Sequence, residues 1–508
     1  MSGASRRRHD GGRIDRSRPL AFTFDGRACQ GYAGDTLASA LIANGVDLVG
    51  RSFKYHRPRG VMSAGAEEVG AVVQLESGAR LVPNMLATQV ELYDGLAARS
   101  VNCWPSLRFD LGTAVGLAGR LLPGGFYYKT FMWPSRLWRG YEHVIRWIAG
   151  LGVSPREVDP DRYERRWDHV DVLVAGGGPA GLAAALAAGR SGARVLLAEQ
   201  DWAFGGALLH DMAQIDGRPA LDWVADALAE LEAMEEVILL PRTTAFGYHD
   251  HNFLTLLERV TDHLGPGAPA HLPRQRLWKV RARQVVLATG AIERPLVFAD
   301  NDRPGVMLAG AARAYANRFA VLAGQKAVVF ANNDSAYQAA LDLADAGVEV
   351  AALVDLRPEP SAHWSSLLAQ RSIEVMAGCA VVATHGLRRV HGVEVAPLGV
   401  DRGGLAGSPR FIACDLVAQS GGWNPTVHLF SQSGGRLVFD EALAAFLPGA
   451  ARQPLKVAGA LAGRFQLADC LNEGYAAGAA AAGDAGFKGA PDAPAFAASE
   501  SPDGRPMA

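Results

Sequence analysis

A glycine-rich turn between an apolar run and a small-residue segment constrains the fold of this chain more than any other feature. Residues 171–200 have the sequence DVLVAGGGPAGLAAALAAGRSGARVLLAEQ, in which Gly176, Gly178 and Gly181 keep the G-x-G-x-x-G spacing. In a strand-turn-helix unit the first glycine allows a tight turn, the second lets backbone amides approach a pyrophosphate, and the third allows close helix packing. The helix start adds partial positive charge for the phosphates. The segment therefore predicts a dinucleotide-binding unit of an α/β fold.

An acidic residue completes this pattern. Glu199 follows Gly181 by eighteen residues and ends the next apolar run, RVLLAE, where a carboxylate would accept a hydrogen bond from an adenosine ribose. The alternative is a glycine-rich turn in an ordinary α/β unit that binds nothing. The residues predicted to line the cofactor cleft are Gly176, Gly178, Pro179, Ala180, Gly181, Glu199, Gln200, Gly205, Gly206, Thr244, Ala288, Thr289 and Gly290.

A second segment has the same outline without the glycines. Residues 326–355, KAVVFANNDSAYQAALDLADAGVEVAALVD, place Asn332, Asp334 and Tyr337 where the three glycines stand, and Asp355 where Glu199 stands. A carboxylate at the second position would repel a pyrophosphate. We therefore predict that this second unit is degenerate, and that Asp334 caps its own helix.

Composition limits the classes of function. A chain of 508 residues is long enough for about three domains, and its net charge of −2 gives no general attraction to nucleic acid or to an anionic membrane. The five cysteines form no C-x-x-C pair, which argues against a zinc ribbon or a redox disulfide and favours a reduced, cytoplasmic setting. No window is apolar for about eighteen residues, so no membrane span is predicted. The sequence His249-Asp250-His251 lies in an expected hairpin and lacks the separated spacing of a zinc site.

The domain boundaries follow from strand, helix and linker signals. We predict a disordered basic tail at 1–19, a β-grasp domain at 20–100, an aromatic-rich connector at 101–168, a dinucleotide-binding domain at 169–295 plus 425–485, an inserted degenerate dinucleotide domain at 296–424, and a linker or tail at 486–508. The connector aromatics are expected either in the core or at an interface.

The order of these segments resembles the two-dinucleotide flavoprotein architecture of the thioredoxin and glutathione reductases. More closely, RSFKYHRPRGV, GGGPAGLAAA, RTTAFGYHDHNF, VVLATGAIERPLVFADNDRPGVMLAGA, NDSAY and GGWNPTVHLFSQSGG together resemble the α subunits of heterotetrameric sarcosine oxidases. The resemblance covers the chain from about Leu20 to about Gly486.

This resemblance implies a cofactor and partners. It implies NAD as a bound, non-catalytic nucleotide in the first cradle, β, γ and δ partner subunits, and oxidative demethylation of sarcosine to glycine on the β chain, with O₂ reduced to H₂O₂. It also implies an FMN shared with the β subunit, for whose phosphate the basic run Arg51, Lys54, Arg57 and Arg59 is one candidate. We find no catalytic constellation in this chain, neither a nucleophile with a base nor an acid and base poised together.

The sequence also departs from its relatives. Related α-type chains carry cluster cysteines after the RPRG turn, and here RPRGVMSAGAEEVGA has none, which predicts a ferredoxin-like domain without a [2Fe–2S] cluster. Flavoprotein relatives have an Asp after the Ala458-Gly459 pair, and here Ala460 stands there, which favours NAD over FAD. The resemblance also implies a C-terminal aminomethyltransferase-like folate domain, which the given sequence does not include; we expect either that this domain is a separate chain or that this is a shortened paralogue that serves another secondary amine. Three alternatives stay open: a self-sufficient FAD-dependent oxidoreductase, an α subunit of another secondary-amine or opine oxidase, and a structural scaffold stabilised by its nucleotide.

Overall fold

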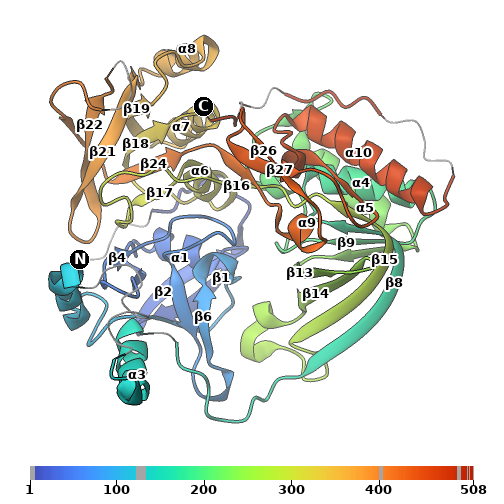
Figure 1. Cartoon of the computed structure of the whole chain (residues 1–508), viewed down its shortest axis with the longest axis horizontal. Helices are drawn as coiled ribbons and strands as arrows, with labels where there is room; N and C mark the ends of the chain where they lie inside the picture. The colour runs from blue at the N-terminus through green and yellow to red at the C-terminus, as the bar shows by residue number, and fades with distance from the viewer. Residues whose placement is uncertain are drawn as a thin grey trace.

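The computed structural model describes residues 6–121, 133–150, 152–399, 404–488, 494–499, 502 and 504–506. Three α/β or β units surround a central region, with the N-terminal unit, the glycine-rich unit and the inserted unit facing one another (Figure 1). Among the described residues no helix is both long and apolar enough to cross a bilayer.

The N-terminal unit is a mixed five-stranded sheet with one helix packed on it. Its strand order is β2-β1-β7-β5-β6, in which β1 pairs antiparallel with β2 and parallel with β7. This is the arrangement expected of a β-grasp domain. Its elements are β1 (Asp15–Phe24), β2 (Arg27–Ala33), α1 (Leu37–Ala43), β3 (Gly50–Arg51), β4 (Pro58–Arg59), β5 (Val72–Leu75), η1 (Gly78–Arg80), β6 (Val82–Leu86), η2 (Ala87–Gln89) and β7 (Leu96–Ser100).

The connector that follows contains η3 (Leu111–Leu121), η4 (Ser135–Leu137) and α3 (Trp138–Ala149). Several of its large apolar side chains are exposed, among them Trp104, Phe109 and Trp133. Residues 122–132, which include several of the predicted aromatics, lie outside the described residues. The described aromatics therefore do not form a core, and an interface role for them stays a prediction.

The glycine-rich unit contains a sheet of order β12-β9-β8-β15-β14-β13, with β28 also paired to β15. Strands β12, β9, β8, β15 and β28 run parallel, while β13 and β14 form an antiparallel extension. The elements are β8 (Tyr163–Ala175), α4 (Pro179–Arg190), β9 (Val195–Ala198), η5 (Gly206–Leu209), β10 (Gln214–Ile215), β11 (Arg218–Pro219), α5 (Ala220–Glu232), β12 (Val237–Leu240), β13 (Thr243–His249), β14 (Phe253–Arg259), η6 (Asp262–Gly267), β15 (Gln275–Leu287), α9 (His428–Gln432), β26 (Leu437–Asp440), β27 (Ala445–Pro448), β28 (Leu455–Val457), η7 (Gly459–Ala462) and α10 (Leu467–Asp484).

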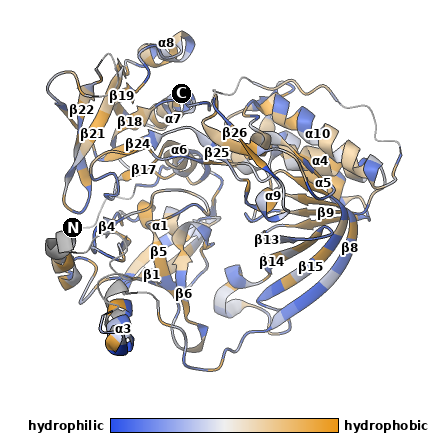
Figure 2. Ribbon diagram, viewed as in Figure 1, coloured by the Kyte–Doolittle hydropathy of each residue, from blue (hydrophilic) through white to orange (hydrophobic). Residues whose placement is uncertain are grey.

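Strand β8 changes character along its length. Its first half is exposed and carries charged residues, and its second half, from Val170 to Ala175, is buried where the sheet meets α4 and α10 (Figure 2). Helix α10 packs closely against α4, since a Cβ at Gly474 or Gly478 would lie 2.2 or 2.1 Å from a carbonyl oxygen of α4. The run of small residues near the C-terminus therefore permits close helix packing, which positions the start of α4.

The inserted unit has a parallel sheet of order β17-β24-β18-β19-β20 and a three-stranded antiparallel sheet β21-β22-β23. A two-stranded ladder, β16 (Ala291–Glu293) with β25 (Trp423–Pro425), carries the chain out of the glycine-rich unit and back. The elements are β17 (Val306–Leu308), α6 (Ala309–Arg318), β18 (Lys326–Ala331), α7 (Ser335–Asp345), β19 (Glu349–Asp355), α8 (Ala362–Gln370), β20 (Val375–Ala377), β21 (Cys379–Gly386), β22 (Val390–Pro397), β23 (Arg410–Ala413) and β24 (Leu416–Ser420).

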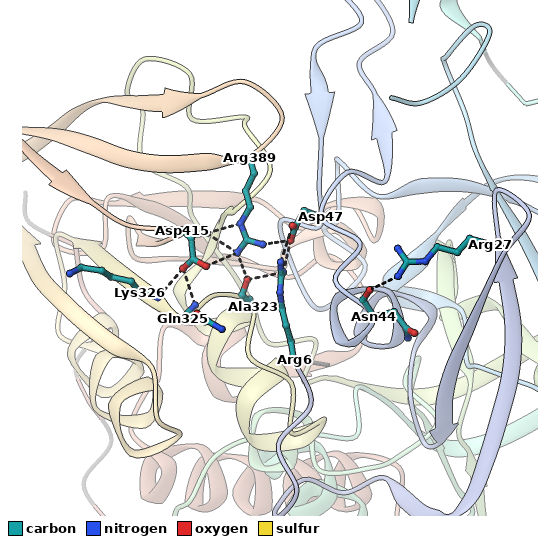
Figure 3. Close-up of polar contacts among 9 residues, drawn as sticks. All are labelled: Arg6, Arg27, Asn44, Asp47, Ala323, Gln325, Lys326, Arg389 and Asp415. Atoms are coloured by element: carbon teal, nitrogen blue, oxygen red, sulfur yellow. Dashed lines mark hydrogen bonds and ion pairs between the residues drawn. The ribbon is translucent and has the colours of Figure 1, made fainter. Parts of the chain in front are cut away.

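The β-grasp unit is docked on the inserted unit by apolar and charged contacts. One hydrophobic cluster is continuous through both units, and the buried Tyr315 hydroxyl donates to the carbonyl of Ser63 at 2.8 Å. At the edge of this contact, Asp47 accepts from both Arg6 and Arg389 (Figure 3). Arg389 also bonds Asp415 of the inserted unit, so one chain of ion pairs joins the two units.

The described part of the predicted basic tail is ordered, which corrects that prediction. Arg6 pairs with Asp47, the Arg8 amide donates to the carbonyl of Ala320 at 2.8 Å, and Arg7 pairs with the buried Asp35 at 2.7 Å. Strand β1 already begins at Asp15. Two of the charges that suggested a solvated tail, Arg6 and Arg7, are thus paired with carboxylates of the folded body.

The C-terminal segment also packs on the body where it is described, against the expectation of a free linker. Ala498 forms a bridge with Ile215, and the Phe496 ring lies 5.9 Å from that of Trp223. Gly504 lies beside Trp423, since a Cβ there would be 2.7 Å from the indole. The segment therefore passes over the region between the two α/β units.

Candidate functional site

A pocket of about 720 Å³ lies at the carboxyl ends of β8 and β9 and continues into the inserted unit. This volume is in the range of small-molecule and cofactor sites. All of the residues predicted to line the cofactor cleft do line it, except Gly181 and Gly205. Gly181 lets the carbonyl of Gly176 approach α4, and Gly205 has φ +126°, a conformation that favours glycine.

The three glycines of the turn are needed for different reasons. Gly176 has φ +105°, and a Cβ there would lie 2.3 Å from the carbonyl oxygen of Ala288. A Cβ on Gly181 would lie 1.8 Å from the carbonyl oxygen of Gly176. Neither position can take a side chain, because neighbouring backbone atoms already occupy the space that a Cβ would need.

Gly178 differs, because the protein itself leaves room for a side chain there. It has φ −75° and ψ −173°, which any residue can adopt, and its Cβ would meet only Gly206 Cα at 3.9 Å. Gly178 lines the pocket and is the N-cap residue of α4, whose first position is Pro179. A side chain at Gly178 would occupy the space in front of the helix start, which is where a pyrophosphate binds. The cradle therefore fits a dinucleotide.

Glu199 lies directly after β9 and lines the same pocket. Its carboxylate accepts from the amides of Gly177 at 2.7 Å and Asp201 at 2.8 Å, which fixes its position after β9. Burial raises the pKa of Glu199 to about 7. Each carboxylate oxygen can accept further hydrogen bonds, so ribose hydroxyls could be recognised here.

The opposite wall comes from the strand that ends at Leu287 and from the ladder that follows it. The Thr289 hydroxyl donates to the carbonyl of Thr426 at 2.9 Å, and the Thr426 amide donates to the carbonyl of Gly290 at 2.9 Å. Ala460 lines the pocket at the position where flavoprotein relatives have a carboxylate. Nearby Glu473 accepts from the Gly459 amide at 2.8 Å and does not line the pocket. These contacts give a flavin ribityl chain no carboxylate from this turn.

Sequence reasoning did not identify several residues that line the same pocket. They are Glu67 from the β-grasp unit, His210 and Asp211 after η5, Glu293 from β16, Arg313 from α6, Trp423 from β25, and Pro502 and Gly504 from the C-terminal segment. Each comes from a segment distant in sequence from the glycine-rich turn. Apart from His210 and Asp211, which belong to the glycine-rich unit itself, only the docking of the units brings them together.

The degenerate second unit contributes a wall instead of a second cradle. Ser335 and Ala339 of α7 line the pocket, and the Trp423 indole donates to the Ser335 hydroxyl at 3.0 Å. The prediction that Asp334 caps α7 is wrong, since its side chain makes no cap hydrogen bond. Asn333 accepts instead from the Ser335 amide and hydroxyl.

Asp334 pairs with Arg357 at 2.7 Å, and Arg357 also pairs with the fully buried Asp355 at 2.7 Å. The Tyr337 hydroxyl donates to Asp355 at 2.7 Å. Side chains at three of the four positions that matched the first cradle are therefore joined through Arg357. These three side chains are therefore satisfied from within the chain.

The three arginines of the basic run in the β-grasp unit make hydrogen bonds and ion pairs within the protein. Arg51 is buried and donates to the carbonyls of Leu107 and His56, Arg57 pairs with Asp300 and Asp302 at 2.6 Å, and Arg59 pairs with Asp302. These three arginines do not fit a flavin phosphate, because each is already engaged.

The hairpin sequence His249-Asp250-His251 lies at the β13–β14 turn. The His249 ring lies 5.7 Å from that of Phe253, and Asp250 accepts from Gln453 at 3.2 Å. Within the described ranges, no three His, Cys, Asp or Glu side chains gather as metal ligands would.

Two family models match the chain. A 2Fe-2S iron-sulfur cluster binding domain matches residues 17–103, and an FAD dependent oxidoreductase matches residues 171–238. The first match contains only Cys29 and Cys103, whereas a [2Fe–2S] cluster takes four protein ligands. Cys29 is buried in β2, and Glu68 holds the loop after the RPRG turn by accepting from the amides of Met62, Ser63, Gly70 and Ala71. The donor set therefore does not fit a cluster.

Known proteins resemble the chain over most of its length. The sarcosine oxidase subunit alpha of Rhizobium meliloti (strain 1021) is 50% identical over 466 residues, which are 92% of this chain and 46% of that subunit. The corresponding subunit of Corynebacterium sp. (strain P-1) is 42% identical over 94% of this chain and 45% of its own length. The crystal structure of L-proline dehydrogenase from P. horikoshii has the same fold, with a TM-score of 0.61, 19% identity, and coverage of 96% of this chain and 77% of that chain. The chain is thus homologous to the sarcosine oxidase α subunits along nearly all of its own length, and it spans about half of theirs.

Proposed function

We propose that this chain is the α-type subunit of a cytoplasmic sarcosine oxidase complex and binds NAD in the pocket at the start of α4. The identity of 50% over 92% of the chain supports the assignment to the complex. Nucleotide binding is supported most directly by Gly178. This residue lines the pocket, and the fold itself does not require a glycine there. Bound NAD is a dinucleotide whose pyrophosphate suits the α4 start and whose adenosine ribose suits Glu199.

The residues of this chain bind and orient the nucleotide and exclude water from it. The glycine-rich turn offers backbone amides, Glu199 accepts from the ribose, and the inserted unit and C-terminal segment close the far side. No described residue pairs a nucleophile with a general base in the pocket. We therefore place amine oxidation on a β subunit, where sarcosine loses two electrons and two protons to give an imine, O₂ accepts them to give H₂O₂, and water hydrolyses the imine to glycine and formaldehyde.

The proposed complex also contains γ and δ subunits, and a separate aminomethyltransferase-like chain could supply folate. An FMN shared with the β subunit stays a prediction, and Arg57 and Arg59, which pair with Asp300 and Asp302, do not supply its phosphate contacts. The ferredoxin-like domain binds no cluster in this proposal, because its span has two cysteines. Its role is to dock on the inserted unit and to complete the pocket with Glu67.

A self-sufficient FAD-dependent oxidoreductase is the second candidate, and the family model that matches residues 171–238 favours it. Ala460 speaks against it, because no carboxylate stands there for a ribityl hydroxyl. Two further alternatives are consistent with the same pocket. The chain would then be an α subunit of another secondary-amine or opine oxidase, or a scaffold that the bound nucleotide only stabilises.

One experiment separates these proposals. The chain is purified alone and with its co-expressed neighbours, both samples are denatured, and the released nucleotides are identified by chromatography while iron is measured. NAD without FAD or iron from the isolated chain, together with copurifying partners, is the expected result. FAD from the isolated chain would favour the self-sufficient enzyme, and iron would contradict the absence of a cluster.

A further inference from the structure

The pocket has a second end, beyond the glycine-rich turn, with an unusual set of side chains. Glu67 reaches it from the loop between β4 and β5, Glu293 ends β16, and Trp423 begins β25. Glu293 is only 6% exposed, and its carboxylate accepts from the Gly310 amide at 2.8 Å. This distal end is built from all three units of the protein.

The positive groups of the distal end are already compensated. Arg313 pairs with Asp211 at 2.6 Å and also with Asp342. Burial and the nearby Arg313 lower the pKa of His210 to about 4, so this imidazole is neutral at physiological pH. In the described part of the chain, neither Glu67 nor Glu293 has an arginine or lysine within ion-pair distance. The distal end therefore carries excess negative charge when these glutamates are ionised.

The direction of a bound dinucleotide follows from the first half of the pocket. Glu199, after β9, is placed for the adenosine ribose, and the start of α4 is placed for the pyrophosphate. The pocket then continues along Thr289 and Gly290 to Glu293. A dinucleotide that follows this wall places its second nucleoside at the distal end, beside Glu293.

We propose that Glu67 and Glu293 make the distal end selective for a cationic aromatic ring, so that the pocket retains oxidised NAD⁺ in preference to NADH. This inference rests on the proposed binding of NAD. The nicotinamide ring carries a positive charge only in the oxidised form, and a carboxylate attracts it strongly where water is excluded. Trp423 lines the same end, and an aromatic face also favours a cation.

This preference has a consequence for the bound nucleotide. Accepting a hydride would remove the ring charge and leave the two glutamates without a cation. A site that binds the oxidised form more tightly therefore opposes reduction of the nucleotide that it holds. Such a pocket suits a permanently bound, unreactive dinucleotide better than a redox cofactor.

The same argument predicts a pH dependence. Burial raises the pKa of Glu293 to about 7, and burial also raises the pKa of Glu67. The groups that face Glu293 are Glu67, the Gly310 amide and Arg313 from α6, and Ser420 from β24, with His210 and Asp211 in the same lining. NAD⁺ favours the ionised glutamates, so its affinity relative to ADP-ribose should rise several-fold between about pH 6 and about pH 8.

The test compares three ligands that share the adenosine and pyrophosphate. NAD⁺, NADH and ADP-ribose are titrated by calorimetry into the nucleotide-depleted full chain, as wild type, Glu293→Gln, Glu67→Gln and, as a surface control, Glu232→Gln. We expect wild type to bind NAD⁺ about tenfold or more tighter than NADH. Glu293→Gln should remove most of that difference and leave the affinity for ADP-ribose unchanged, and Glu232→Gln should change neither.

The outcomes are distinguishable. Equal binding of NAD⁺ and NADH by wild type overturns the inference and leaves nucleotide binding intact, and this comparison needs no variant to fold. Equal loss of all three ligands in Glu293→Gln also overturns it, because a merely structural role would produce that result. If neither ADP-ribose nor NAD⁺ binds, the proposed nucleotide fails and this inference fails with it.

Discussion

Arg357 lies between Asp334 and Asp355, 2.7 Å from a carboxylate oxygen of each, in the unit that has lost its glycine-rich turn. Asp355 is fully buried, and the Arg357 side chain is mostly so. Arg357→Ala would leave two close carboxylates without their cation. Because breaking a buried ion pair strands a charge, we expect a loss of about 3–5 kcal/mol in the free energy of unfolding.

Denaturant titration of Arg357→Ala measures this loss. Arg371→Ala is the matched control, since Arg371 pairs with Asp345 on the surface and should contribute less than about 1 kcal/mol. A loss at Arg357 no larger than at Arg371 would contradict the role of this pair.

Two alanine substitutions in the glycine-rich turn should have opposite effects. Gly178→Ala introduces a Cβ that meets no protein atom closer than 3.9 Å, so stability should change by less than about 1 kcal/mol while bound nucleotide is lost. Gly181→Ala places a Cβ 1.8 Å from the Gly176 carbonyl oxygen and should cost about 3 kcal/mol or more. The measurements are the melting temperature and the nucleotide content per chain. Full nucleotide occupancy in Gly178→Ala would exclude the cradle as the binding site.

Glu199 should make the effect of nucleotide on stability depend on pH. Its folded pKa is raised to about 7, above the usual value of about 4.3. Its ionisation therefore costs stability progressively as pH rises between these values, at about 1.4 kcal/mol per pKa unit. A ribose hydroxyl that donates to the carboxylate offsets this cost. ADP-ribose should raise the melting temperature more at about pH 8 than at about pH 5, and Glu199→Ala should reduce the rise at both. A rise independent of pH would argue against this contact.

The ion pairs of Asp47 should stabilise the contact between the β-grasp unit and the inserted unit. Its carboxylate bonds Arg6 and Arg389, and although burial opposes it, these arginines hold its pKa below the usual range. Its contribution to stability is therefore present above about pH 4 and is lost as pH falls through the lowered pKa. Arg389→Ala should weaken the docking of the β-grasp unit on the inserted unit and so speed proteolytic cleavage of the chain that follows the β-grasp unit. Arg410→Ala, which removes an exposed pair with Glu374, should leave cleavage unchanged.

The local sequence patterns predicted the glycine-rich turn and Glu199, but they did not predict the residues that other units contribute to the pocket. Gly176, Gly178 and Glu199 fall within one strand-turn-helix-strand unit, so their spacing alone places them together. Glu67 precedes that unit by about one hundred residues, and its place in the pocket depends on how the β-grasp unit docks. The capping prediction for Asp334 was wrong because an arginine two residues after β19 competes for the carboxylate, a long-range pairing that sequence does not show. The arginines near the N-terminus were misjudged for the same reason.

The ladder between the two α/β units has one more implication. Glu293 and Trp423 are register partners in β16 and β25, the two strands on which the inserted unit is suspended, and both line the pocket. A rotation of the inserted unit about these two connecting strands would displace both side chains at once. Ligand occupancy and the orientation of the inserted unit are therefore thermodynamically linked. A contact that fixes the angle between the two units also changes the affinity of the pocket, and a bound ligand favours one angle to the same extent.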